Sequence, residues 1–209
     1  MKANRDRGRK SGRNVIALLL LLAAVCAAAA NGDAPAGWRT YHSRDHGFAI
    51  AYPGDFTFYS DPQKAPRSYM AVCAAESVAC FQYSGQEYKG TNFGAAGLSV
   101  NILGSLHSED DCRRIEGAAG SVQTVTINGV LFSYANTSEG AMSHLISGPV
   151  YRTFHDQTCY EVALLITSTN IGVYDPAAVK EFDSTRVAKQ LDAMLHTFRF
   201  VSHAKAGSQ

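Results

Sequence analysis

Residues 122–134 read VQTVTINGVLFSY, two alternating runs of polar and apolar residues separated by Asn128 and Gly129. An Asn-Gly pair favours a type I′ turn, because both central residues of that turn take positive φ. The stretch therefore predicts a β-hairpin with strands at 122–127 and 130–134. It is the clearest local signal in the chain and indicates antiparallel pairing.

Segments on both sides of the hairpin also have the pattern of strands. GFAIAY at 47–52 alternates as a half-buried strand does, and a Pro-Gly turn follows it. Residues 162–166 are continuously apolar, which is expected of a central strand at 159–167. Further strands are expected at 56–59, 69–74, 79–83, 98–103, 142–146 and 150–154. Together these segments predict a mostly antiparallel sheet.

The C-terminal part of the chain changes to a helical period. An apolar stripe there consists of Val187, Leu191, Met194, Leu195 and Phe198. Asp183 or Ser184 would cap this helix, and Ser108 would cap a shorter helix that runs to about Glu116. Because an apolar helix stripe needs a sheet to pack on, we expect an α+β fold, an antiparallel β-sheet with helices packed on it.

Residues 1–30 have the organisation of a secretory signal peptide. Six basic residues and one acidic residue precede an apolar run of 16 residues, 15–30, that ends in three alanines. The run is shorter than the roughly 20 residues that cross a bilayer, and small residues at its end are typical of a signal-peptidase site. We expect cleavage near Asn31 and a periplasmic or secreted location, with an uncleaved N-terminal anchor as the alternative.

Removal of the signal would change both the domain organisation and the charge. A breaker-rich spacer at 31–37 would lead into a single domain at 38–201, followed by a loose polar tail at 202–209. The remaining chain has 13 basic and 17 acidic side chains and a net charge of −4, compared with +1 for the whole sequence. It contains no cluster of Lys and Arg, which argues against nucleic acid and anionic membrane surfaces as partners.

Four cysteines would remain after cleavage: Cys73, Cys80, Cys112 and Cys159. An even number in an exported chain indicates disulfides, and four cysteines allow three connectivities. We favour Cys73 with Cys80 and Cys112 with Cys159, because the first two lie on adjacent short apolar runs. A four-thiolate zinc site is the alternative, although the chain lacks a Cys-x-x-Cys pair, the usual half-site of a structural zinc.

The segment 84–97 is rich in glycine and has little hydrophobic periodicity, which predicts a long mobile loop. Within it Tyr88, Lys89, Asn92 and Phe93 combine aromatic and polar side chains, as recognition loops do. These four residues are the candidate partner-binding residues. A loop without a ligand is the alternative.

The sequence has no specific catalytic, cofactor-binding or metal-binding motif. The nucleophile elbow, the zinc-protease helix motif and both glycine-rich phosphate loops are absent. His42 and His46 have the spacing of a metal pair only on a helix, which nothing predicts there. The acids of Ser108–Asp111 could attract a cation, but acids in the first turn of a helix stabilise its dipole without one. We therefore expect no catalytic residue, cofactor or metal ligand.

Two motifs near the ends of the expected domain resemble the PsbP-like group. Trp38-x-x-Tyr41 followed by HGFAIAYP at 46–53 resembles the opening strand and turn, and LDAMLHTFRF at 191–200 resembles the last helix and final strand. YRTF at 151–154 with CYE at 159–161 is similar to uncharacterised exported bacterial proteins of this kind. The resemblance implies an α/β sandwich and a non-enzymatic role in binding or stabilising partners. It transfers no functional residues, because the matching positions build the fold.

These observations favour an exported, non-enzymatic binding or accessory domain that acts on a protein or cell-envelope partner. The alternative is a small secreted hydrolase or metal-dependent enzyme. An enzyme should have a deep cleft in which His42, His46 or His155 lies beside an acid. A binding module should have a filled core and exposed aromatic loops.

Overall fold

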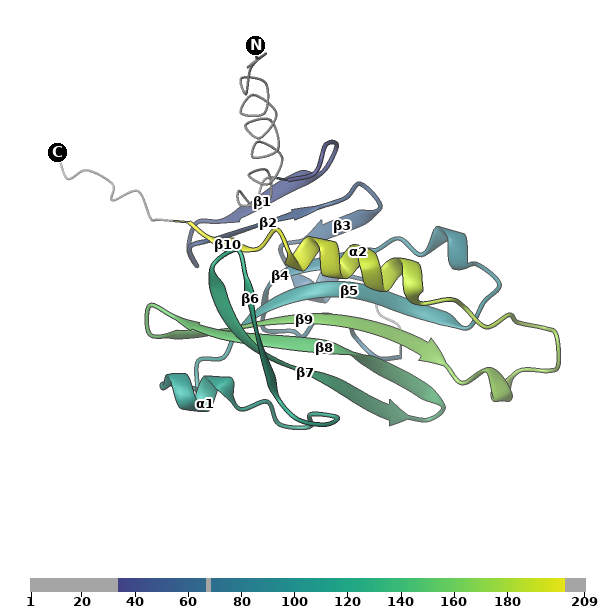
Figure 1. Ribbon diagram of the computed structural model, residues 1–209. Helices are drawn as coiled ribbons and strands as arrows, with labels where there is room; N and C mark the ends of the chain where they lie inside the picture. Colours follow the sequence, from purple (N-terminus) through teal and green to yellow (C-terminus); the bar gives the residue numbers. More distant parts are fainter. Residues whose placement is uncertain (1–33, 67–68, 202–209) are drawn as a thin grey trace, which may run out of the picture. The chain divides into compact units, whose positions relative to one another are not determined.

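The computed structural model describes residues 34–66 and 69–201 (Figure 1). The expected signal peptide at 1–30, the first part of the spacer and the tail at 202–209 lie outside the described residues. The strands are β1 (Arg39–Ser43), β2 (Phe48–Tyr52), β3 (Phe56–Tyr59), β4 (Ser77–Tyr83), β5 (Phe93–Ile102), β6 (Gln123–Ile127), β7 (Val130–Ala141), β8 (His144–His155), β9 (Thr158–Thr169) and β10 (Arg199–Phe200). The helices are α1 (Glu109–Arg113) and α2 (Thr185–Leu195), with short 3-10 turns η1 (Pro62–Lys64), η2 (Gln86–Tyr88) and η3 (Ile171–Val173).

The strands form two antiparallel sheets. The larger has seven strands in the order β3-β4-β5-β9-β8-β7-β6, and the smaller has three in the order β1-β2-β10. Strand β9 is central, as its continuous apolar run predicted. Helices pack on these sheets, so the α+β fold class expected from the sequence is confirmed.

The hairpin at 122–134 forms as predicted. Asn128 and Gly129 both have positive φ, 48° and 76°, and Ile127 pairs with Val130 across the turn. The expected strands at 142–146 and 150–154 are instead one strand, β8, preceded by a turn. Met142 and Ser143 take positive φ in that turn without glycine, so the turn has no local signature in the sequence.

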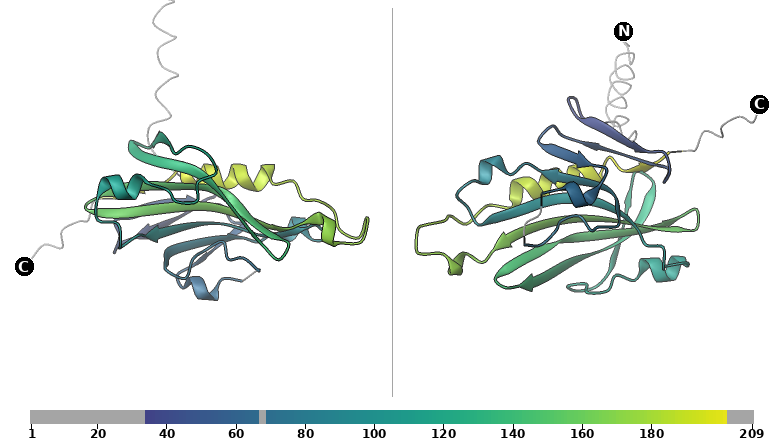
Figure 2. Two further views of the ribbon diagram at one scale, coloured as in Figure 1. Left: turned by 90° about the horizontal axis from the view of Figure 1, so that it is seen from below. Right: turned by 180° about the vertical axis from the view of Figure 1, so that it is seen from behind.

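Helix α2 and the small sheet pack on one face of the large sheet. The buried stripe of α2 meets Phe48 and Ile50 of β2 and the apolar side chains of β4, β5 and β9 in a single core. The other face is covered by α1 and by the segment that contains η1, and Figure 2 shows α2 and that segment on opposite sides of the large sheet. The expected stripe is confirmed for Val187, Leu191, Met194 and Leu195, which are buried on α2. Phe198 is also buried in the core, but it lies after the helix, which ends at Leu195.

Two segments differ from the sequence-based expectation. Residues 69–74 form bends and not a strand, because Cys73 bonds to Cys80 of β4 and Val72 packs into a small second core on the outer face. Strand β1 was not expected, because its exposed residues at 39–42 carry no continuous alternation.

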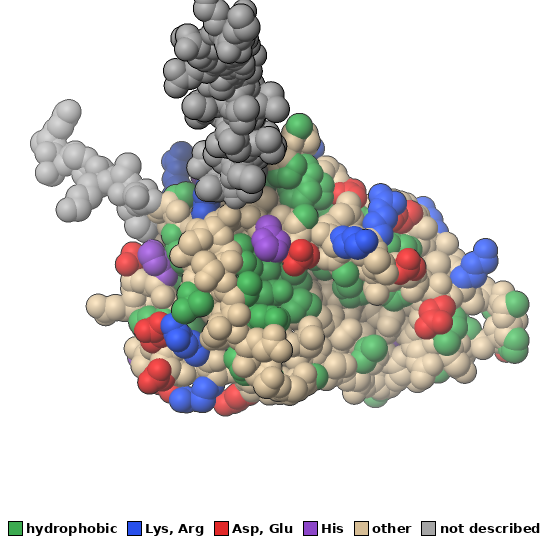
Figure 3. Space-filling model, in the orientation of Figure 1, with side chains coloured by type: hydrophobic (Ala, Val, Ile, Leu, Met, Phe, Trp, Pro, Cys, Tyr) green, Lys and Arg blue, Asp and Glu red, His purple; other side chains and the backbone are tan. Residues whose placement is uncertain are grey.

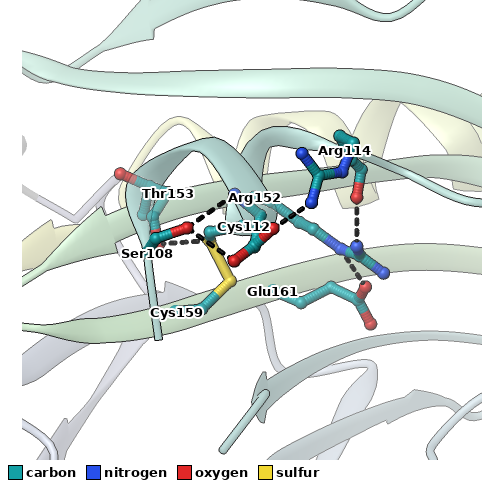
Figure 4. The surroundings of a disulfide bond; sticks show 8 residues. Ser108, Cys112, Arg114, Arg152, Thr153, Cys159 and Glu161 are labelled. Atoms are coloured by element: carbon teal, nitrogen blue, oxygen red, sulfur yellow. Dashed lines mark hydrogen bonds and ion pairs between the residues drawn. A yellow bond between two sulfur atoms is a disulfide. The ribbon is translucent and has the colours of Figure 1, made fainter. Parts of the chain in front are cut away.

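Both favoured disulfides are present. Cys73 bonds to Cys80 and Cys112 bonds to Cys159, with Cα–Cα distances of 5.8 and 5.6 Å. The second joins α1 to β9, and Figure 4 shows Arg152 beside it, between Arg114 and Glu161. Arg152 Nε lies 2.8 Å from Glu161 Oε2, and its Nη1 donates to the carbonyl of Arg114 at 2.5 Å. Two such disulfides are typical of an oxidising, extracytoplasmic compartment.

Candidate functional site

A cleft of about 490 Å³ lies between α2 and the strands β8 and β9. We call it the α2 cleft. Its lining consists of Leu145, Ser147, Gly148, Pro149, Leu164, Ile166, Ser168, Glu181, Phe182, Ser184, Ala188, Leu191 and Asp192. Figure 1 shows α2 lying along β5 and β9, and in Figure 3 hydrophobic side chains gather on the same face beside and below α2. The volume is within the range of roughly 300–1,000 Å³ that is common for ligand sites.

The sheet is irregular at Gly148 and Pro149, which both line the cleft. Pairing between β8 and β9 stops at Ser147, opposite Ile166, and resumes at Val150. Gly148 has no side chain, and a Cβ there would collide with the carbonyl oxygen of Leu164. Pro149 has no N–H to donate to the ladder. The ladder between β8 and β9 is therefore interrupted in the part of the sheet that lines the cleft.

The floor of the cleft is apolar and its rim is acidic. Leu164 and Leu191 are buried at its base, with 3% and 1% of their surface exposed. Glu181 and Asp192 are both exposed, and the lining includes no Lys, Arg or His. His196 Nε2 lies 3.6 Å from Asp192 Oδ2 on the outer side of the helix. The cleft therefore combines apolar surface with negative charge.

Three of the four candidate loop residues hold one wall of this cleft in place. Asn92 Oδ1 accepts a hydrogen bond from the Phe182 N–H at 2.9 Å, and Tyr88 Oη donates to the Asp183 carbonyl at 3.2 Å. The rings of Tyr88 and Phe93 both contact Phe182, with centroids 5.6 and 5.4 Å apart. The segment 181–184, which supplies Glu181, Phe182 and Ser184 to the cleft, is thereby fixed to the rest of the fold.

The loop itself is shorter than predicted. Strand β5 begins at Phe93, so the expected mobile loop at 84–97 shrinks to 84–92 and includes the turn η2. Gly97 lies within β5, at a position where a Cβ would press on the Phe81 carbonyl and on Val72. Asn92 is buried with 6% of its surface exposed, whereas Lys89 is exposed. Glycine was therefore misread as a sign of flexibility where it allows close packing.

The pKa of Tyr151 depends in part on the charge of Asp192. Burial, together with the charge of the Asp192 carboxylate and with Tyr134, raises the pKa of Tyr151 from 10.0 to about 12. The Tyr151 ring also stacks on Tyr134 at 5.3 Å.

We expect D192N to lower the pKa of Tyr151, because it removes a negative charge that opposes the phenolate. To isolate the signal of Tyr151, the ultraviolet titration of the Y151F variant is subtracted from that of the unchanged chain. The same subtraction is made in the D192N protein. The contribution of neutral Tyr151 to stability is complete below pH 10 and is lost as the pH rises through about 12. The control E139Q removes an acid on the opposite face of the sheet and should leave this pKa unchanged; an equal shift in both variants would contradict the assignment.

A second hollow, of about 630 Å³, contains His46 and His155 with Asp45 and Asp156. A hollow in which a histidine lies near an acid is part of what an enzyme would require. However, His155 stacks on Phe200 with centroids 3.7 Å apart, and its Nε2 lies 3.5 Å from its exposed neighbour Asp156. The side chains of His155 and Asp156 are 43% and 84% exposed, so water reaches both.

The hydroxyl groups of this hollow are already engaged. Tyr160 Oη donates to the His46 carbonyl at 2.9 Å, and Thr158 Oγ1 donates to the Asp156 carbonyl at 3.4 Å. No Ser or Cys lines the hollow. It therefore has no hydroxyl or thiol that a histidine is placed to activate.

The other titratable groups named from the sequence lie apart. His42 lies in β1 and His46 in the turn after it, so the two are not on a helix. Ser108 caps α1, accepting from the Asp111 N–H, and two acids of this turn, Glu109 and Asp111, pair with Arg113 and Arg114. Within the described residues, no three His, Cys, Asp or Glu side chains are grouped so as to hold a metal ion. Within the same residues, no helix is long and apolar enough to cross a membrane.

No protein-family model and no curated protein matches the chain. Similar solved structures include a Bacteroides thetaiotaomicron protein, with a TM-score of 0.48 and 11% identity over 81% of this chain and 50% of that one. They also include the cyanobacterial PsbP of Synechocystis (0.44, 12%, over 81% and 96%) and the Saccharomyces cerevisiae Ran-binding protein Mog1p (0.44, 12%, over 78% and 95%). A PsbP is thus among the similar structures, as the terminal motifs led us to expect. These likenesses concern the fold alone.

Proposed function

We propose that this chain is an exported, non-enzymatic binding or accessory domain that acts on a protein or cell-envelope partner through the α2 cleft. The observation that carries the proposal is the cleft itself, a preformed apolar concavity with a few polar groups at its rim. The signal-like sequence at 1–30 and the two disulfides support export.

The composition of the cleft favours binding over catalysis. Three serines supply hydroxyl groups, but the lining has no His, Lys or Cys, and among the described residues neither Glu181 nor Asp192 is hydrogen-bonded to a serine so as to activate it. Leu164 and Ile166 of β9 and Leu191 of α2 instead contribute apolar lining. Such a surface gains free energy from desolvating an apolar partner, at roughly 25 cal/mol per Å² buried.

The candidate loop would serve this site in two ways. Asn92, Tyr88 and Phe93 keep the wall at 181–184 in position for the partner. Lys89, which is exposed, would remain available for direct contact. The role we propose for the loop is therefore mainly to position the cleft wall.

Filling the cleft should abolish partner capture. We expect A188W to place an indole in the cleft from α2 and to reduce the capture of partners from the cell-envelope fraction by about tenfold or more. Capture is measured by mass spectrometry of material retained by the immobilised full chain.

The matched control is A193W. Ala193 is an exposed alanine of the same helix but does not line the cleft, so this variant should capture as the unchanged chain does. Neither variant touches the hollow around His155, so a loss limited to A188W assigns binding to the cleft. Equal capture by the unchanged chain and A188W would refute the proposal.

A further inference from the structure

Both charged residues that line the α2 cleft are acidic. Glu181 has no basic side chain within 4 Å among the described residues, and Asp192 has only His196. Since like charges repel and opposite charges attract across an exposed rim, an anionic ligand is disfavoured and a cationic one is favoured. The net charge of −4 outside residues 1–30 adds to this preference.

The concave surface continues beyond the cleft. A further hollow of about 510 Å³, distinct from the one around His155, shares Leu145, Ser168 and Glu181 with the α2 cleft and extends along the β7–β8 turn. Met142, at that end, is 93% exposed, and Leu145 is 41% exposed. The combined concave surface, apolar under α2 and mixed polar and apolar toward the β7–β8 turn, is therefore elongated, which suits an extended chain better than a compact small molecule.

Two hydroxyl groups on the sheet side of the cleft are free to bind. Ser147 and Ser168 lie on the same face of β8 and β9 as Ile166. Neither hydroxyl has a hydrogen-bond partner among the described residues, and both can donate to and accept from the backbone of a bound segment.

Resting on the proposed function, we infer that the α2 cleft binds an extended segment of a protein partner in which apolar residues alternate with Lys or Arg. In an extended segment, successive side chains point to opposite sides. The apolar side chains would therefore enter the cleft over Leu164 and Leu191, while the basic side chains reach Glu181 and Asp192 at the rim.

The test uses three labelled peptides and the purified full chain in fluorescence anisotropy. The probe GLKLSLKLG has leucine at alternate positions and two lysines. In one matched peptide glutamate replaces lysine, and in the other serine replaces leucine. We expect the probe to bind and both matched peptides to bind about tenfold more weakly, because one loses the attraction to the rim and the other loses apolar burial.

Charge variants separate this inference from the proposed function. E181Q/D192N should weaken binding of the probe about tenfold, because it removes two carboxylates, each of which would form roughly one exposed ion pair with a lysine of the probe. The control E76Q/E139Q removes two exposed acids outside the cleft and should have no effect. A188W should abolish binding of the probe, and A193W should not.

Several outcomes would overturn the inference. If E181Q/D192N binds the probe as the unchanged chain does, or if the glutamate peptide binds equally well, the cleft does not select a basic segment. If A188W still binds the probe, the peptide binds elsewhere. If vesicles containing a cationic alkylamine bind and the peptides do not, the ligand is a lipid. Each of these results leaves the proposed function to be judged by the A188W capture experiment.

Discussion

The double variant C112A/C159A should lose about 4 kcal/mol of unfolding free energy, measured by denaturant titration of the full chain. The two cysteines are 47 residues apart in sequence, so their bond removes a large amount of conformational entropy from the unfolded chain. In the folded state the bond holds α1 against β8 and β9, next to the Arg152–Glu161 pair.

The matched comparison is C73A/C80A. Those cysteines are only 7 residues apart, so the expected loss is about 2.5 kcal/mol. Both variants remove one buried disulfide and no charge, and only the length of the closed loop differs greatly between them. Equal losses would show that loop length does not determine the contribution of these bonds.

The variant G148A should be at least as damaging, with an expected loss of about 4 kcal/mol or more. Gly148 has a φ of +152°, a conformation that side chains rarely adopt. Its Cβ would meet the backbone of Leu164, which cannot rotate away as a flexible side chain can. The central strands β8 and β9 would have to separate, and the floor of the α2 cleft would be deformed with them.

G140A is the control for this position. Gly140 lies on the neighbouring strand β7, its φ is not in the positive region, and a Cβ there would lie 3.5 Å from the His144 carbonyl, an ordinary contact. We expect a change within about 0.5 kcal/mol. A similarly small loss for G148A would mean that β8 can move away from β9 at little cost, and that the close approach of Gly148 to Leu164 does not constrain the sheet.

The candidate site could be predicted from the sequence only in part. The residues Tyr88, Asn92 and Phe93 were singled out for their composition, and they do lie beside the cleft. Their role could not be foreseen, because Asn92 finds its partner Phe182 about ninety residues further along the chain. Glu181 and Asp192 carried no signal at all, since isolated acids on a helix or in a loop usually face water.

Local features determined what the sequence could establish by itself. The Asn128-Gly129 turn, the apolar stripe of α2 and the Ser108 cap depend on residues a few positions apart, so their physics can be read from a short window. They were sufficient to predict an antiparallel sheet with helices packed on it.

The α2 cleft was decided only by the tertiary structure. It combines residues of β8, β9 and the 181–192 segment, which the register of the sheet and the packing of α2 bring together. Gly148 and Pro149 line it where the pairing of β8 with β9 is interrupted, and α2 supplies the opposite side. A concavity is a property of several surfaces at once, and no periodicity along one segment encodes it.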